Sequence, residues 1–351
     1  MKLRRLITPF AVLAIVAAAC GGGDDADADP DKITFGFIPS ERSETLQDDI
    51  KPIMAALGDE MGIEVEGIVT ADYNGLVVAL GTGQVDVGAF GPVGYVQAKD
   101  QYSDDIDLLL KSVRFGAPTY HGQWFATPEV AAELCDTPPA EGALDNTSDG
   151  VSIMDVTEVL ATQVGKTSGS GNTEAEVLDD GRPVDPGLVC MASLEDIKGY
   201  KVAFGSATST SGSVYPRLQL LDLGFDLDSD IEFSYLGSHD DAVLAVYTGD
   251  FDIGVSFDDA RRNVRSEHPD VGSKVVVFNI TDEIPNDVVA VRASLSDDFK
   301  QSLYDAIEAY LATDEGKAAF DEVYEWSAIT TAEDSEFDIV RDAVDKLGLT
   351  E

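Results

Sequence analysis

Apolar residues along most of the chain recur either in short runs or in steps of three to four, with glycines between the blocks. Runs rich in β-branched and aromatic residues predict strands. Before residue 128, such runs cover residues 33–38, 64–69, 85–90, 107–113 and 123–127. Ile53, Leu57 and Met61 step by four and end at Gly62, which predicts a helix after the first strand. This alternation indicates an α/β sheet covered on both faces.

The same alternation returns after Tyr200. Strands are expected at 202–204, 232–236, 252–256, 275–278 and 288–291, and helices at 211–223 and 240–248. A stripe of Phe299, Leu303, Ile307 and Leu311 follows Ser296, a suitable N-cap, and predicts a helix near the C-terminus. Residues 80–88 and 246–254 also resemble each other, so we expect two similar lobes with a ligand cleft between them.

The segment 128–193 interrupts this pattern. It is rich in Thr, Gly, Pro and Asp and has weak periodicity, which predicts a loop-rich insertion. It holds Cys135 and Cys190, the two cysteines of the folded body. In an exported protein these two would form a disulfide; two buried free thiols are the alternative.

The first residues have the layout of a secretory signal peptide. Lys2, Arg4 and Arg5 precede an apolar stretch of about 14 residues that ends in small residues before Cys20. This stretch is shorter than the ~20 residues that span a bilayer. The Cys after small residues resembles a bacterial lipobox. We therefore expect removal of residues 1–19, lipidation of Cys20 and a flexible acidic linker over 20–31, which would anchor an extracytoplasmic body to the membrane. A soluble secreted protein is the alternative.

The charge excludes several classes of partner. The chain of 351 residues has 66 acidic and 23 basic residues, a formal net charge of −43, and 44% hydrophobic residues. The hydrophobic content is that of a globular protein. Nucleic acids and anionic lipid surfaces require clustered Lys and Arg, so neither is an expected partner. The excess of acidic residues indicates a well-solvated surface, as in proteins from high-salt habitats.

A Ser/Thr-rich turn is the clearest candidate for chemistry. Residues 205–212 (GSATSTSG) lie between a predicted strand and a predicted helix. Such a turn directs hydroxyls and backbone N–H groups outward at the positive end of the helix dipole, which suits an anion. The alternative is a cap that only begins the helix.

His239 follows another strand, in the segment Gly237-Ser238-His239-Asp240. It is either a site residue or an exposed capping residue. Ser, His and Asp together formally allow a hydrolase triad, but the sequence has no G-x-S-x-G elbow. Three scattered histidines and no Cys-x-x-Cys give no support for a metal, and we expect no cofactor.

Taken together, these segments resemble the phosphonate- and phosphite-type substrate-binding proteins of ABC importers. The resemblance covers the body from Ile33 to about Leu347, apart from the insertion. It rests on residues 72–76 (DYNGL), 85–92 (VDVGAFGP), 116–120 (GAPTY), 209–212 (STSG), 237–239 (GSH) and 284–287 (IPND).

The resemblance implies a type II periplasmic-binding-protein fold, with two lobes and two crossovers between them. Lobe 1 would hold residues 32–127 plus 286–351, and lobe 2 residues 128–285. The implied function is delivery of a phosphorus oxyanion to a membrane permease by a monomeric, non-enzymatic protein. The implied ligand-binding residues are Tyr73, Tyr120, Ser209, Thr210, Ser211, His239 and Asp287. Asp259 falls where some members place a Glu that receives a ligand amine.

Asp287 suggests how such a site would reject sulfate. An ionised carboxylate only accepts hydrogen bonds, so it favours a ligand that keeps a P–OH proton. Sulfate has no proton to give, and an unpaired acceptor facing its oxygens is unfavourable. Two other functions stay open from the residues alone: an exported sensor or adaptor of a phosphorus-responsive signalling system, and a serine-type phosphoester hydrolase.

Overall fold

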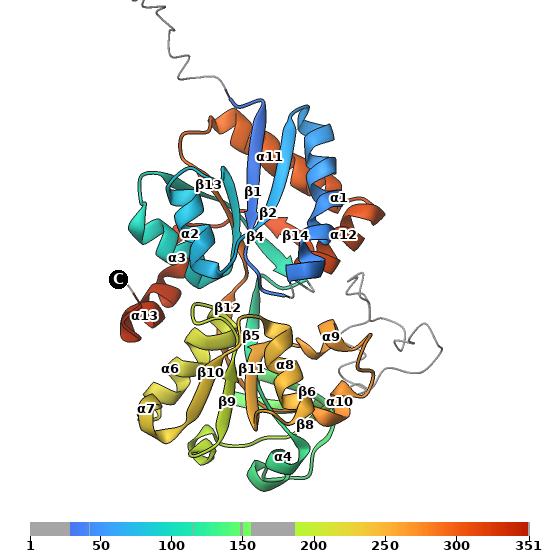
Figure 1. The fold of residues 1–351 in the computed structure, drawn as a ribbon, viewed down its shortest axis with the longest axis vertical. Helices are drawn as coiled ribbons and strands as arrows, with labels where there is room; N and C mark the ends of the chain where they lie inside the picture. The colour runs from blue at the N-terminus through green and yellow to red at the C-terminus, as the bar shows by residue number, and fades with distance from the viewer. Residues whose placement is uncertain (1–28, 42, 115, 148–149, 156–186, 350–351) are drawn as a thin grey trace, which may run out of the picture.

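The computed structural model describes residues 29–41, 43–114, 116–147, 150–155 and 187–349, and it shows two α/β lobes stacked end to end (Figure 1). The predicted signal peptide, Cys20 and nearly all of the predicted linker lie outside these residues. Within them, no helix is both long and apolar enough to cross a membrane.

Lobe 1 is built on a six-stranded sheet in the order β14-β4-β13-β3-β1-β2. Its strands are β1 (Lys32–Phe37), β2 (Glu64–Val69), β3 (Val87–Phe90), β4 (Ile106–Arg114), β13 (Val288–Arg292) and β14 (Trp326–Thr330). β1 pairs in parallel with β2 and β3, whereas β13 and β14 run antiparallel to their neighbours. Its helices are α1 (Ser43–Met61), α2 (Tyr73–Gly81), α3 (Pro92–Gln101), α11 (Asp297–Leu311), α12 (Asp314–Tyr324), η3 (Asp334–Phe337) and α13 (Asp338–Lys346).

Helix α11 shows why the chain folds as its pattern predicts. The Ser296 side chain accepts a hydrogen bond from Phe299 N and caps the helix. The stripe Phe299, Leu303, Ile307 and Leu311 is buried as expected. Burial of one such side chain contributes roughly 2 kcal/mol to folding.

Lobe 2 has an eight-stranded sheet in the order β10-β9-β11-β5-β12-β8-β6-β7. Its strands are β5 (Thr119–Ala126), β6 (Ala140–Thr147), β7 (Gly150–Asp155), β8 (Leu188–Val189), β9 (Lys201–Phe204), β10 (Glu232–Tyr235), β11 (Ile253–Phe257) and β12 (Val276–Pro285). Its helices are α4 (Pro128–Leu134), η1 (Leu194–Ile197), η2 (Thr210–Val214), α6 (Tyr215–Asp222), α7 (Leu227–Asp230), α8 (His239–Thr248), α9 (Arg261–Val264) and α10 (Val271–Lys274).

The chain crosses between the lobes twice, as predicted. One crossing joins β4 to β5 and the other joins β12 to β13. The predicted lobe 1 includes residues 119–127, whereas β5 pairs with β11 and β12 of lobe 2, so the first crossing comes before Thr119. Buried Asn286 ties the crossings together, because its Nδ2 donates to Ser112 O at 3.1 Å and to Ala117 O at 2.8 Å.

The insertion is more regular than predicted in its described part. It contains α4 and strands β6, β7 and β8, which extend the lobe 2 sheet, rather than only loops. β8 has only two residues, and β6 (AEGALDNT) consists mostly of residues that are uncommon in strands, which explains why the sequence pattern missed them. Cys135 and Cys190 form the expected disulfide, with 5.9 Å between their Cα atoms.

Candidate functional site

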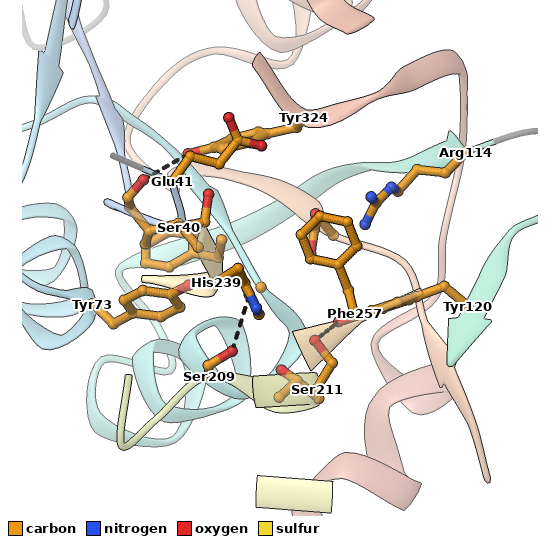
Figure 2. Close-up of a pocket in the computed structure, with 15 residues that line it drawn as sticks. Ser40, Glu41, Tyr73, Arg114, Tyr120, Ser209, Ser211, His239, Phe257 and Tyr324 are labelled. Atoms are coloured by element: carbon orange, nitrogen blue, oxygen red, sulfur yellow. Dashed lines mark hydrogen bonds between the residues drawn. The ribbon is translucent and has the colours of Figure 1, made fainter. Parts of the chain in front are cut away.

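A small cavity lies where the two lobes meet (Figure 2). Its volume is about 40 Å³, which has room for only a few groups the size of water. Both lobes and both crossings line it: Ile38, Ser40, Glu41, Tyr73, Phe90, Gly91, Arg114, Tyr120, Ser209, Thr210, Ser211, His239, Phe257, Asp287 and Tyr324. Seven of the eight residues predicted to bind ligand are in this set.

The Ser/Thr-rich turn forms the lobe 2 wall of the cavity. Ser209 caps the helical turn η2, where its Oγ accepts a hydrogen bond from Gly212 N at 3.1 Å. Position 212 requires glycine, since a Cβ there would lie 2.9 Å from Ser209 Oγ and 3.0 Å from His239 Cε1. The hydroxyls of this turn therefore lie at the start of a helix. The hydroxyls and backbone N–H groups can donate hydrogen bonds to an anion, and the positive end of the helix dipole attracts it.

Tyr73 and Tyr120 supply two further hydroxyls. Tyr73 is the first residue of α2, which Asp72 caps by accepting a hydrogen bond from Gly75 N at 2.7 Å. Tyr120 lies at the start of β5, and its hydroxyl donates to Ser211 Oγ at 3.5 Å. Burial raises the pKa of both phenols above the usual value. Both therefore stay protonated and can donate to a ligand oxygen.

His239 is a buried site residue, not an exposed cap. It begins α8 behind the capping residue Ser238 and is only 6% exposed. Its Nδ1 lies 2.8 Å from Ser256 Oγ, and its Nε2 lies 3.4 Å from Ser209 Oγ. Burial, helped by the charge of Arg114, lowers the pKa of His239 to about 3, so the ring is neutral at pH 7. A hydrolase triad would place a carboxylate at Nδ1, where this ring meets a hydroxyl.

Asp287 reaches the cavity from the second crossing. A Cβ on Gly91 would lie 3.7 Å from both Asp287 Oδ1 and Thr210 Oγ1, which places this carboxyl opposite the turn. Burial raises the pKa of Asp287 to about 6, although the charge of Arg114 opposes the shift. Its protonation can therefore change close to neutral pH.

Asp259 is the predicted site residue that the structure places elsewhere. It does not line the cavity; its carboxylate accepts hydrogen bonds from Arg261 Nε at 2.9 Å and Nη2 at 2.7 Å. Burial alone would raise the pKa of Asp259, but the charge and hydrogen bonds of Arg261 hold it below its usual range. The structure does not support the expected role of Asp259 in receiving a ligand amine, because its carboxylate lies outside the cavity and pairs with Arg261.

Arg114 is the main cavity residue that sequence reasoning missed. It is the last residue of β4 and is only 7% exposed. Its guanidinium lies over the rings of Phe257 and Tyr120, with centroids 4.6 and 5.5 Å away. Glu41 and Tyr324 were also missed. The one available signal for Arg114 was a basic residue at a strand end beside the GAPTY segment.

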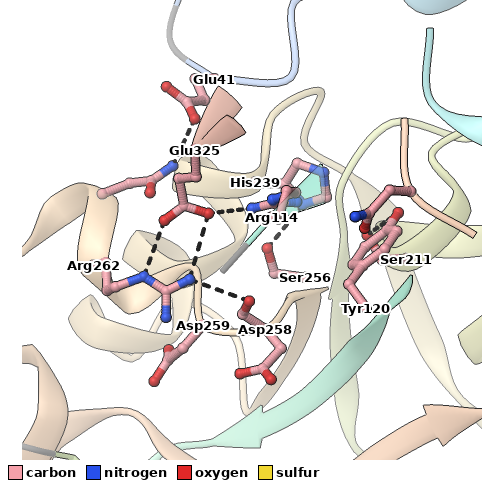
Figure 3. Close-up of polar contacts among 12 residues, drawn as sticks. Glu41, Arg114, Tyr120, Ser211, His239, Ser256, Asp258, Asp259, Arg262 and Glu325 are labelled. Atoms are coloured by element: carbon pink, nitrogen blue, oxygen red, sulfur yellow. Dashed lines mark hydrogen bonds and ion pairs between the residues drawn. The ribbon is translucent and has the colours of Figure 1, made fainter. Parts of the chain in front are cut away.

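Arg114 belongs to a buried charge cluster that spans both lobes (Figure 3). Glu325, at the end of α12, forms an ion pair with Arg114 of its own lobe. The same carboxylate accepts a hydrogen bond at 2.9 Å from Nε of Arg262, in α9 of lobe 2. Burial would raise the pKa of Glu325, but the two arginines lower it, so the group is ionised.

Other hydrogen bonds also join the lobes around the cavity. His239 N donates to Ser40 O at 2.9 Å, and Val93 N donates to Thr210 Oγ1 at 3.0 Å. The side chain of Asn263 donates to a Glu41 carboxylate oxygen at 3.1 Å. The structure is therefore a closed form, in which contacts between the lobes surround the predicted anion site.

No cluster of His, Cys, Asp and Glu among the described residues has the arrangement of a metal site. The donors in the cavity are hydroxyls, one neutral imidazole and one guanidinium. This set suits a small oxyanion, since it offers many hydrogen-bond donors and one positive charge.

Comparison with known proteins agrees with this chemistry. Residues 35–337 match the family model described as "ABC transporter, phosphonate, periplasmic substrate-binding protein". The chain is 26% identical over 275 residues to the phosphate-import protein PhnD of Mycolicibacterium smegmatis, covering 74% of this chain and 67% of the relative. It is 20% identical to the phosphonates-binding periplasmic protein of Escherichia coli, covering 82% and 69%.

A solved structure shares the fold. PhnD1 of Prochlorococcus marinus, solved in complex with methylphosphonate, has a TM-score of 0.68 at 18% identity, covering 91% of this chain and 99% of that chain. The binding component of a phosphonate transporter from Pseudomonas aeruginosa has a TM-score of 0.65 at 19% identity, covering 90% and 86%.

Proposed function

Because this chain belongs to the family of periplasmic substrate-binding proteins of phosphonate ABC transporters, we propose that its cavity captures a small phosphorus oxyanion and that the closed protein delivers it to a permease. One observation carries the proposal. Hydroxyls from both lobes meet in one cavity with His239: Tyr73 comes from lobe 1, and Tyr120 and Ser209 to Ser211 come from lobe 2. A ligand held by both lobes stabilises the closed form relative to the open one.

The candidate ligands are phosphate, phosphite and alkyl- or aminoalkylphosphonates. All offer several oxygens that accept hydrogen bonds from neutral donors and from Arg114. The small cavity favours the smaller members of this set, because a few water-sized groups already fill it. Lipidation of Cys20 would hold the protein at the outer face of the cytoplasmic membrane, near its permease.

Calorimetric titration of the purified protein tests the proposal. The ligands are phosphate, phosphite, methylphosphonate, aminoethylphosphonate and sulfate, each at low and high salt. We expect tight binding of at least one phosphorus ligand and no heat from sulfate. If none of the four phosphorus ligands produces a binding heat, the proposed function is contradicted, while the fold assignment still holds.

A further inference from the structure

Arg114 is the one Lys or Arg among the residues that line the cavity. Its guanidinium carbon lies over two aromatic rings, 4.6 Å from the centroid of Phe257 and 5.5 Å from that of Tyr120. Stacking leaves the N–H groups on the edges of the guanidinium available for hydrogen bonds. Figure 2 shows the group pointing from its strand toward Phe257.

The hydrogen bonds of Arg114 are incomplete in the described part of the protein. One edge, through Nη2, pairs with Glu325. The Nε atom is buried and has no partner there. A buried donor without an acceptor is unfavourable, so the ligand-free closed cavity has a donor that an oxyanion could satisfy.

The carboxylate that pairs with Arg114 is not its exclusive partner. Glu325 is shared between two arginines: Arg114 donates to Oε2, and Arg262 donates to Oε1 at 2.9 Å and to Oε2 at 3.4 Å. One carboxylate neutralises only one of them. Arg262 belongs to lobe 2 and reaches Glu325 in the closed form, so closure makes Arg262 compete with Arg114 for this carboxylate, while the charges of Asp258 and Asp259 also act on Arg262. Asp287 and Glu41 are the acidic groups on the cavity wall; burial raises the pKa of Glu41 well above its usual range and that of Asp287 to about 6, so Asp287 is mostly ionised at pH 7.

We propose that Arg114 is a ligand-binding residue that gives a charge-assisted hydrogen bond to the phosphorus oxyanion, and that Arg262 is a positioning residue acting through Glu325. This inference rests on the proposed function. It assigns a specificity role to the cluster: a full positive charge favours ionised phosphorus ligands over neutral polar molecules of the same size.

The test compares ligand affinity in variants of the full protein. Arg114→Met removes the donors and the charge, and we expect about 10- to 100-fold weaker binding of whichever phosphorus ligand the wild type holds. Arg262→Met should weaken binding less, and Arg262→Lys should restore most of the loss. Arg341→Met, in α13 and outside the cavity, is the matched control and should bind like the wild type.

A second measurement keeps the inference testable if Arg114→Met does not fold. The 15Nε–H resonance of Arg114, assigned by its absence from Arg114→Lys, should shift when the bound phosphorus ligand is added to the wild-type protein. An unshifted resonance, or affinity of Arg114→Met within twofold of the wild type, would overturn the inference. A wild type that binds none of the phosphorus ligands would instead overturn the proposed function.

Discussion

The Nε atom of Arg262 lies 2.9 Å from a carboxylate oxygen of Glu325, and this ion pair joins the two lobes beside the cavity. Glu325 is 4% exposed and also pairs with Arg114, so three charges share a buried site. Removing the central carboxylate leaves two buried arginines facing each other. Removing one partner of a buried ion pair lowers the free energy of unfolding far more than removing one partner of a surface pair.

Glu325→Gln should therefore lower the free energy of unfolding by about 3 kcal/mol, the range measured when one partner of a buried pair is removed. Denaturant unfolding checks this value. Glu322→Gln, an exposed position in the same helix, is the matched control and should change stability by less than about 0.5 kcal/mol. Equal stabilities of the two variants would contradict a buried ionic role for Glu325.

Asp287→Asn should relax the rejection of sulfate. The asparagine side chain offers N–H donors to sulfate oxygens, whereas an ionised Asp287 offers only acceptors. Calorimetry should then detect sulfate binding in the variant while the wild type stays silent. If the variant rejects sulfate as strongly as the wild type, another group sets this selectivity.

Asp287 should also make stability depend on pH between about 4 and 6. Its folded pKa of about 6 lies above the unfolded value near 3.9, so the folded state holds the proton more tightly. This contribution is fully present below pH 4 and is lost as pH rises through 6. The stability of the wild type relative to Asp287→Asn should fall by about 2 kcal/mol over this interval in ligand-free protein.

Denaturant titrations of both proteins at several pH values measure this difference, in which the other acidic groups cancel. A flat difference from pH 4 to pH 7 would mean that Asp287 has an ordinary pKa in the folded protein.

The Cys135–Cys190 disulfide should stabilise the protein without affecting ligand binding. It closes a loop with a sequence separation of 55, and the chain-entropy model then gives roughly 4 kcal/mol. Neither cysteine lines the cavity. The double variant Cys135→Ser/Cys190→Ser should unfold at lower denaturant yet bind the phosphorus ligand with unchanged affinity. A parallel loss of affinity would show that the insertion contributes to the site.

The elements predicted from the sequence were those whose patterns are local. The stripe on α11 repeats every four residues, and the turn from Ser209 to Ser211 carries its own capping signal, so the sequence pattern predicts both. The charge cluster could not be found in this way. Arg114, Arg262 and Glu325 are far apart in the sequence; the pairing of β4 with β14 brings Arg114 to Glu325 within lobe 1, and the closed arrangement of the lobes adds Arg262. The ligand-binding role expected for Asp259 was wrong because this carboxylate pairs with its neighbour Arg261, a contact that the resemblance to the family did not predict.

The paired crossings, with Asn286 bonded to both sides of the first, determine how the protein can move. We expect two adjacent connections that are hydrogen-bonded to each other to act as a single hinge about which the lobes open and close. A pair of fluorophores placed on α2 and α8 would convert occupancy of the cavity into a single optical distance, so the same hinge makes this protein a ready scaffold for a sensor of its own ligand.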